Sequence, residues 1–258
     1  MKNTTELKIE NNAAWYKTWF DSVFYHQLYS NRSEKEAIDF IDALMNELNP
    51  PAKSTMLDLG CGAGRHAKRL AAKGFDVMGL DLAPSSIRSA KKYEKANLHF
   101  AKHDMRDPFG DNSFDYVFNF FTSFGYFKSD KENNNVISNI SRALKPGGSL
   151  ILDYLNVAWC EDRVVVEEAK EIDGIIYRIS RWADERFFYK KIAIEDMPPG
   201  QSEFIEQVAK FDLDDFDGMF KQNGLKLDKV FGDYRLSKYD AVTSPRMILV
   251  ANKRAVQS

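Results

Sequence analysis

The stretch that decides the fold is Leu57-Asp58-Leu59-Gly60-Cys61-Gly62-Ala63-Gly64. It follows a short apolar run and precedes a segment with helical spacing. Glycines at such a strand-to-helix turn allow tight backbone turns and let a ligand touch the main chain. The glycines alone do not identify the ligand, because Gly62-Ala63-Gly64-Arg65-His66-Ala67 also satisfies the G-x-G-x-x-A pattern of dinucleotide-binding proteins.

On both sides of this loop, short apolar runs alternate with helical segments. The runs predicted as strands are Met56–Leu59, Phe75–Leu80, Leu98–Ala101, Phe114–Phe120 and Leu150–Tyr154, and the helices lie near His66–Lys73, Ser85–Ala96 and Lys131–Leu144. This alternation predicts a parallel sheet with helices on both faces. A helix near Leu213–Asn223 and strands near Leu227–Phe231 and Met247–Ala251 complete it. We therefore predict an α/β fold with a Rossmann-like, doubly wound, mostly parallel sheet of seven strands.

The stretch 157–211 departs from this rhythm and predicts an antiparallel β insertion after the fifth strand. Its expected strands are Val164–Val166, Gly174–Trp182, Arg186–Ile194 and Phe204–Phe211. The remaining residues, 1–156 and 212–258, are expected to form one ligand-binding domain. Ligands bind at the carboxyl ends of the strands in doubly wound sheets. Because the insertion leaves from that end, we expect it either to cover the substrate or to form a homodimer contact.

The N-terminal helices, residues 13–49, are predicted to cap this domain. Trp15–Tyr29 is rich in aromatic residues and has helical spacing. A second helix is expected to start at Ser33, where Ser33-Glu34-Lys35-Glu36 matches a capping box, and to end at Pro50-Pro51.

Composition excludes some partners. The 258 residues carry a net charge of −2 and scattered basic side chains, so no nucleic-acid partner is expected. No apolar run suits a membrane helix, and no signal peptide is visible at the start of the sequence. With only two cysteines, these features predict a cytoplasmic protein. No Cys/His cluster has zinc-ligand spacing, so we expect no metal site.

Acidic residues near three successive strand ends indicate which ligand the loop holds. Asp58 stands two residues before Gly60, so the loop reads Asp-x-Gly-x-Gly-x-Gly. Asp81 ends the next strand, 21 residues after Gly60, where a carboxylate can accept hydrogen bonds from both ribose hydroxyls. Asp104 follows the third strand.

Together with the turn Leu144-Lys145-Pro146-Gly147-Gly148, these motifs resemble those of class I methyltransferases that depend on S-adenosyl-L-methionine (SAM). The resemblance implies SAM as cofactor and S-adenosyl-L-homocysteine (SAH) as product. It implies that Asp104 binds the adenine amino group and that the backbone of Met105 meets the adenine ring. The expected cofactor-binding residues are Tyr25, Asp58, Gly60, Cys61, Gly62, Gly64, Arg65, His66, Asp81, Leu82, Asp104, Met105 and Asn119.

The chain most resembles bacterial members of this class whose first motif reads Gly-Cys-Gly-x-Gly-Arg-His. They carry a Tyr-His pair in an aromatic N-terminal helix, here Tyr25-His26, and the sequence Asn-x-Phe-Thr-Ser-Phe-Gly-Tyr-Phe at the end of the fourth strand, here Asn119–Phe127. The amino-sugar N-methyltransferases, which share an antiparallel insertion, are more distantly similar. Tyr126 and His26 are the candidate catalytic residues, although His26 also suits a packing role or the SAM carboxylate. We expect a small-molecule acceptor, with N-, O- and C-methylation all open.

Two other functions use the same kind of loop. One is an NAD(P)-linked oxidoreductase, which Asp58, the pair Asp104-Met105 and the turn Pro146-Gly147-Gly148 count against. The other is a non-catalytic SAM-binding protein, which the intact set of motifs disfavours.

Overall fold

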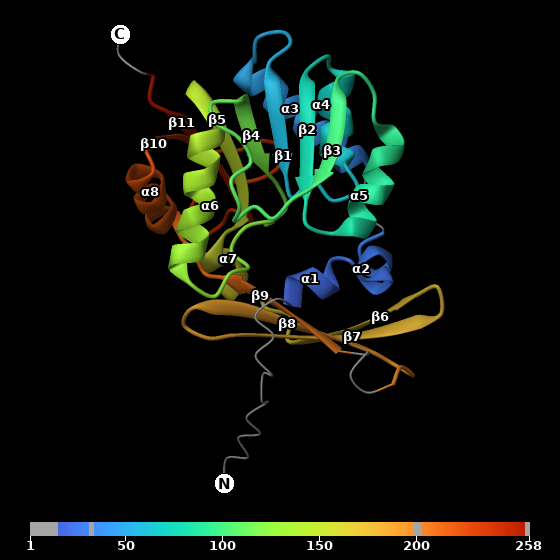
Figure 1. Cartoon of the computed structure of the whole chain (residues 1–258). Helices are drawn as coiled ribbons and strands as arrows, with labels where there is room; N and C mark the ends of the chain where they lie inside the picture. Colours follow the sequence, from blue (N-terminus) through green and yellow to red (C-terminus); the bar gives the residue numbers. More distant parts are fainter. Residues whose placement is uncertain (1–14, 31–33, 199–202, 256–258) are drawn as a thin grey trace.

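The structure, a computed structural model, describes residues 15–30, 34–198 and 203–255. Their larger sheet has seven strands in the order β10-β11-β5-β4-β1-β2-β3 (Figure 1). The strands are β1 (Thr55–Leu59), β2 (Asp76–Asp81), β3 (Leu98–Lys102), β4 (Phe114–Asn119), β5 (Leu144–Leu155), β10 (Leu225–Phe231) and β11 (Arg246–Lys253). The first five pair in parallel, whereas β11 is antiparallel to both of its neighbours. The predicted Rossmann-like, mostly parallel sheet of seven strands is confirmed.

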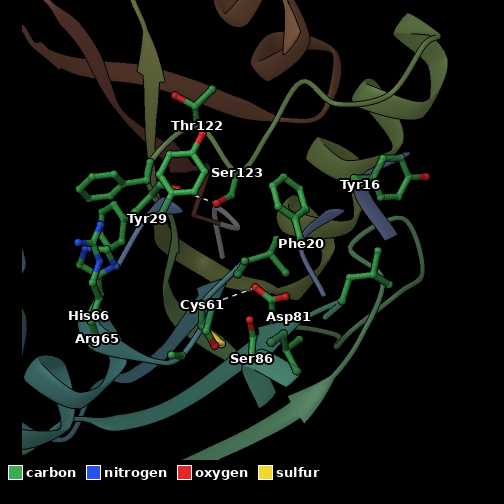
Figure 2. A pocket seen from close by; sticks show the side chains of 18 of the residues that line it. Tyr16, Phe20, Tyr29, Cys61, Arg65, His66, Asp81, Ser86, Thr122 and Ser123 are labelled. Atoms are coloured by element: carbon green, nitrogen blue, oxygen red, sulfur yellow. Dashed lines mark hydrogen bonds between the residues drawn. The ribbon is translucent and has the colours of Figure 1, made fainter. Parts of the chain in front are cut away.

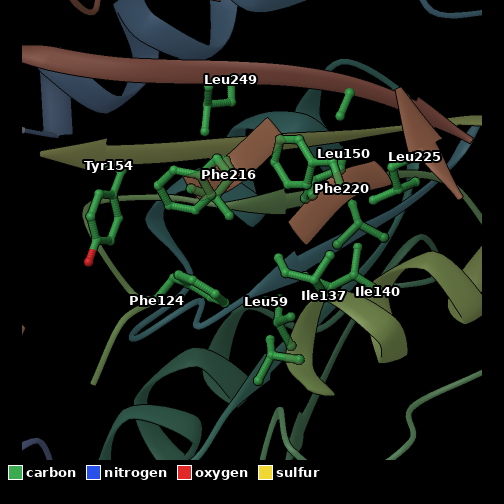
Figure 3. Close-up of a cluster of buried hydrophobic side chains, with 14 of the residues drawn as sticks. Leu59, Phe124, Ile137, Ile140, Leu150, Tyr154, Phe216, Phe220, Leu225 and Leu249 are labelled. Carbon is green, nitrogen blue, oxygen red and sulfur yellow. The ribbon is translucent and has the colours of Figure 1, made fainter. Parts of the chain in front are cut away.

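Helices cover both faces of this sheet, because the side chains of each strand alternate between two apolar layers. In β1, Leu57 and Leu59 belong to one buried cluster and Met56 to the other. The first cluster packs under α6 (Asp130–Ala143) and α8 (Leu213–Gln222), whose Ile137, Ile140, Phe216 and Phe220 appear in Figure 3. The second packs under α3 (Glu34–Leu48), α4 (Arg65–Ala72) and α5 (Pro84–Ala90); a 3-10 turn, η1 (Lys91–Tyr93), follows α5.

A second sheet of four antiparallel strands follows β5 and a short helix, α7 (Val157–Glu161), that the sequence did not predict. Its strands are β6 (Glu167–Ile172), β7 (Ile175–Ala183), β8 (Phe187–Ile194) and β9 (Glu203–Ala209). All four fall within the predicted insertion. That this sheet forms a unit separate from residues 1–156 and 212–258 stays a prediction.

The strand predicted at Val164–Val166 is wrong. Val165 and Val166 are 57% and 63% exposed, and the first strand of the second sheet starts at Glu167. This strand, β6, is a charged edge strand that pairs on one side only, with β7. Edge strands often carry many charged residues, so the run of three valines just before β6 predicted the strand too early in the sequence.

The single helix predicted over Trp15–Tyr29 is also wrong, because the segment forms two helices, α1 (Trp15–Trp19) and α2 (Val23–Leu28). Ser22 lies at the break, where its hydroxyl accepts a hydrogen bond from the backbone N–H of Tyr25 at 3.1 Å. Such a serine favours a new helix start over a continuous helix. Ser33, the expected cap of the next helix, lies outside the described residues, which begin again at Glu34 in α3.

Both short helices lie between the two sheets (Figure 1). Trp19 and Leu28 are buried against Tyr177 and Ile179 on the inner face of the second sheet. On the other side, the Asp21 carboxylate accepts a hydrogen bond from the backbone N–H of Ser85 in α5 at 2.6 Å. The N-terminal helices therefore join the two sheets. Within the described residues, no helix has the length and apolar character that crossing a membrane requires.

Candidate cofactor and acceptor site

A cavity of about 720 Å³ lies at the carboxyl ends of the parallel strands, where ligands bind in doubly wound sheets. The main sheet lines it mostly with residues at or just after the ends of β1 to β4, together with Leu155 of β5 and Arg246 of β11. Residues in and next to α1 and α2, and residues of β9, line the opposite wall. The volume suits a small-molecule ligand of cofactor size. The residues of the opposite wall are Tyr16, Phe20, Tyr25, His26, Tyr29, Glu206 and Val208.

The glycine loop lies between β1 and α4 at the base of this cavity. The backbone N–H groups of Gly60 and Cys61 both donate to the Leu80 carbonyl, at 2.7 and 3.0 Å, which ties the loop to β2. Gly62 lines the cavity, and a Cβ on it would meet no heavy atom within 4 Å. Gly64 does not line it; a Cβ there would approach the Phe100 ring to 2.6 Å. Gly62 thus leaves room for a ligand, and Gly64 allows close packing of the helix.

Asp81 connects the loop to the end of β2. Its Oδ2 accepts a hydrogen bond from the N–H of Gly62 and its Oδ1 from the N–H of Ala83, both at 2.8 Å. Figure 2 shows this carboxylate beside Cys61 at the cavity. Burial raises the pKa of Asp81 above its usual value, although these hydrogen bonds oppose the shift. Each oxygen keeps a lone pair for one further donor, so the geometry fits the two hydroxyls of a ribose.

Asp58 and Asn119 lie beneath the loop and do not line the cavity. Asp58 is 1% exposed, accepts the N–H of Ala67 in α4 at 3.2 Å, and has its pKa raised to about 7 by burial. Asn119 donates to the Leu59 carbonyl at 2.9 Å, and its buried Oδ1 has no hydrogen-bond partner among the described residues. Asp58, Asn119 and Gly64 were expected to bind the cofactor, but none of them lines the cavity. They instead support the glycine loop from the side that faces away from the cavity.

Asp104, expected to bind adenine, lines the cavity but is already engaged. Arg106 donates to it through Nε at 3.1 Å and Nη2 at 2.8 Å, and also contacts Glu132. Burial alone would raise the pKa of Asp104, but the hydrogen bonds from Arg106 lower it. Met105 lines the cavity next to it. The carboxylate therefore stays charged and fixed in one orientation.

The candidate catalytic residues reach the cavity from two different elements. His26 comes from α2, and its Nε2 lies 3.0 Å from the Ser85 hydroxyl. Burial lowers the pKa of His26, with Asp21 and Asp81 opposing the shift, which favours a neutral imidazole. Tyr126 follows β4, and its ring contacts Trp15 and Phe20 at centroid distances of 5.4 and 5.2 Å.

The remaining expected residues also line the cavity: Tyr25, Gly60, Cys61, Arg65, His66 and Leu82. The Arg65 guanidinium lies 3.9 Å from the centroid of the Phe121 ring, and the His66 ring stacks on the same phenylalanine at 5.4 Å. Figure 2 shows these two side chains on one flank of the cavity, away from Asp81.

Three residues that the sequence analysis did not name take part in the site. Arg246 of β11 and Glu206 of β9 line the cavity, and Asp153 of β5 is fully buried beside it. For two of them, Glu206 and Asp153, the sequence holds a pattern that could have indicated a buried acidic residue. Glu206 shares a face with Phe204 and Val208 by the period-2 rule, and Asp153 interrupts an otherwise apolar buried strand.

Comparison with known proteins agrees with this geometry. Residues 56–148 match the family model of the methyltransferase domain. The chain is 33% identical over 132 residues to a putative methyltransferase, YqeM, of Bacillus subtilis, a match that covers 50% of this chain and 51% of the relative. The chain therefore spans about half the length of that relative.

A longer match joins the chain to dTDP-3-amino-3,4,6-trideoxy-alpha-D-glucopyranose N,N-dimethyltransferase of Streptomyces venezuelae. The two are 24% identical over 206 residues, which cover 76% of this chain and 85% of the relative. Among solved structures, an S-adenosylmethionine-dependent methyltransferase from Clostridium acetobutylicum superposes with a TM-score of 0.74 at 18% identity, covering 90% of this chain and 96% of the other.

Residues 56–148 therefore match a methyltransferase domain, and the fold of the chain is that of a SAM-dependent methyltransferase, in agreement with the predicted class and cofactor. The antiparallel β11 between β5 and β10 also departs from the strand order 3-2-1-4-5-6 of dinucleotide-binding sheets. This difference counts against the NAD(P)-linked alternative.

Proposed function

We propose that the protein transfers the methyl group of SAM to a small molecule that shares the cavity with the cofactor. The single observation that carries this proposal is the continuity of the cavity, which runs from the glycine loop and Asp81 to Tyr126 and Glu206. When bound, SAM supplies an electrophilic methyl group on a sulfonium. The named activity of the Streptomyces venezuelae relative, on a sugar nucleotide that carries an amino group, supports a small-molecule acceptor.

The proposed cofactor contacts follow from the geometry. Gly60, Gly62 and Cys61 would offer backbone surface to the cofactor, and Asp81 would accept the ribose hydroxyls. Asp104 and Met105 would meet the adenine ring. Holding two reactants in line can lower a barrier by about 7–11 kcal/mol without an acid or base. The main task proposed for these residues is therefore orientation.

The acceptor is proposed to lie against Tyr126 and His26. A neutral His26, favoured by its lowered pKa, can accept a proton from an acceptor that must lose one. The α1 and α2 helices and the second sheet would exclude water from the reacting groups. Because Glu206 and Val208 of β9 line the cavity, the insertion is proposed to cover the substrate rather than to serve only as a homodimer contact. Light scattering of the purified protein tests whether it forms a homodimer.

Thermal-shift measurements with SAM, SAH, NAD and NADP test the cofactor. We expect stabilisation by SAM and SAH only, and stabilisation by NAD but neither SAM compound would overturn the proposal. Transfer of label from methyl-labelled SAM to an added small molecule then tests the activity. Binding of SAM without transfer to any acceptor would favour the non-catalytic alternative.

A further inference from the structure

A carboxylate from the second sheet enters the cavity among aromatic rings. Glu206 lies on β9, lines the cavity and is 16% exposed in its side chain. The same wall carries Phe20, Tyr25 and Tyr29, and the centroid distances are 5.0 Å between Phe20 and Tyr25 and 4.9 Å between Tyr25 and Tyr29. Figure 2 shows Phe20 and Tyr29 as part of this lining. Glu206 is therefore the acidic group in an otherwise largely aromatic wall.

Neighbouring side chains fix the orientation of this carboxylate. Its Oε1 accepts hydrogen bonds from Trp19 Nε1 at 2.7 Å and from the Tyr29 hydroxyl at 2.9 Å. In the described parts of the chain, its Oε2 contacts only Lys190 Nζ, at 3.5 Å. That distance exceeds the 2.7–2.9 Å typical of a charged N–H···O hydrogen bond. One oxygen is therefore saturated by neutral donors, while the other can accept a strong hydrogen bond.

Lys190 is better placed to hold Tyr29 than to neutralise Glu206. It donates a hydrogen bond to the Tyr29 hydroxyl, and its ammonium lies 4.6 Å from the centroid of that ring. Burial lowers the pKa of Lys190, with Glu206 opposing the shift. A buried charge is costly unless it is well paired. The Glu206 carboxylate would thus gain from a closer cationic or N–H partner in the cavity.

The chemistry of this wall selects among acceptors. A carboxylate next to aromatic faces attracts an ammonium or amine, through a charged hydrogen bond and cation–π contact. It repels carboxylates and phosphates that approach the same oxygen, and it offers a neutral hydroxyl a weaker gain. A fixed negative charge also stabilises a positive charge that develops next to it during a reaction.

We propose that Glu206 Oε2 binds the amino group of the methyl acceptor, so that the substrate class is an amine; this inference rests on the proposed methyltransferase activity. The amine donates one N–H to Glu206 and keeps its lone pair for the reaction. That lone pair forms the new N–C bond as the C–S bond breaks and its electron pair stays on sulfur. The positive charge moves from sulfur to nitrogen, beside Glu206, and one N–H proton later passes to the neutral His26, the base of the proposed function, or to water.

The Glu206→Gln variant tests the proposal, since it removes the charge and keeps the shape. Its matched control is Glu203→Gln, which lies on the same strand with a 56% exposed side chain paired to Lys191. Titration calorimetry on SAH-saturated protein compares cyclohexylamine and benzylamine with cyclohexanol and benzyl alcohol. We expect the amines to bind about 10- to 100-fold more tightly than the alcohols, as expected for hydrogen bonds to a charged group. Glu206→Gln should abolish this preference, and Glu203→Gln should retain it.

The affinity for SAH itself is the internal check of folding and should not change in either variant. Equal binding of amines and alcohols, or binding of neither, overturns the proposal. Weaker SAH binding by Glu206→Gln also overturns it, because the carboxylate would then belong to the cofactor. If wild-type protein binds neither SAM nor SAH, the proposed function itself fails, which the amine titrations alone would not reveal.

Discussion

Asp153, near the carboxyl end of the buried strand β5, accepts a hydrogen bond from the backbone N–H of Phe121 at 2.8 Å. Phe121 and the next residue, Thr122, both have left-handed backbone angles, with φ of 55° and 56°. Such angles are unfavourable for residues other than glycine and persist only where the surroundings enforce them. The Arg246 guanidinium supplies a second restraint, since it donates to Asp153 and to the Thr122 hydroxyl at 2.8 and 2.9 Å.

Asp153→Asn is therefore expected to lower the free energy of unfolding by about 3 kcal/mol, because it leaves the largely buried Arg246, whose side chain is 20% exposed, without its counter-charge. Urea denaturation measures this change. Asp111→Asn is the control, because Asp111 pairs with Arg142 on the surface, where ion pairs contribute about 1 kcal/mol or less. Similar losses in the two variants would show that the turn after β4 does not depend on Asp153.

Asp81→Ala should weaken binding of SAH by about 1.5–3 kcal/mol, the range for hydrogen bonds to a charged group. Titration calorimetry gives the dissociation constant. Asp76→Ala, at the other end of the same strand and exposed, is the matched control and should bind as wild type does. An unchanged affinity in the Asp81 variant would remove this carboxylate from the cofactor site.

The raised pKa of Asp58 predicts a pH dependence of stability. The folded protein keeps this proton up to a pKa of about 7, whereas the unfolded chain loses it near the ordinary value of 3.8. In that window the folded state binds more protons, so stability falls as the pH rises from about 4 to about 7 and then levels off. The shift of about three units corresponds to up to about 4 kcal/mol.

Asp58→Asn should remove this part of the pH dependence. Unfolding free energies of both proteins at pH 5 and pH 8 give the comparison, and the difference between the proteins should change by a few kcal/mol between the two pH values. Parallel pH profiles would mean that Asp58 is ionised in the folded protein.

Tyr126→Phe should reduce the rate of methyl transfer more than it reduces cofactor affinity, because Tyr126 lies on the proposed acceptor side. Single-turnover rates with labelled SAM and the SAH dissociation constant separate the two effects. Tyr93→Phe offers a control at the cavity edge, where the tyrosine is 51% exposed. Equal effects on rate and affinity would place Tyr126 with the cofactor.

The main sheet and the cofactor loop could be predicted from the sequence because both depend on local patterns. The Asp58–Gly64 motif, its strand and its helix lie within a few residues of one another. The break between α1 and α2 was local too, but the aromatic periodicity of Trp15–Tyr29 masked the capping role of Ser22.

The wall of α1, α2 and β9, which is proposed to receive the acceptor, could not be predicted from the sequence in the same way. Glu206 meets Trp19 and Tyr29 only because the second sheet folds back onto the N-terminal helices. The pairing of Asp153 with Arg246 likewise depends on the antiparallel register of β5 and β11. Such contacts follow from tertiary packing, so a sequence pattern shows at most that an acidic residue faces inward.

The hydrogen bond between Trp19 and Glu206 joins residues that are 187 positions apart. Closing so long a loop costs chain entropy that only later contacts repay. During synthesis on the ribosome, the glycine loop and Asp81 emerge long before β9. A nascent chain that has reached β5 therefore already holds most of the cofactor residues, whereas the wall proposed to receive the acceptor is completed only after β9 has been made.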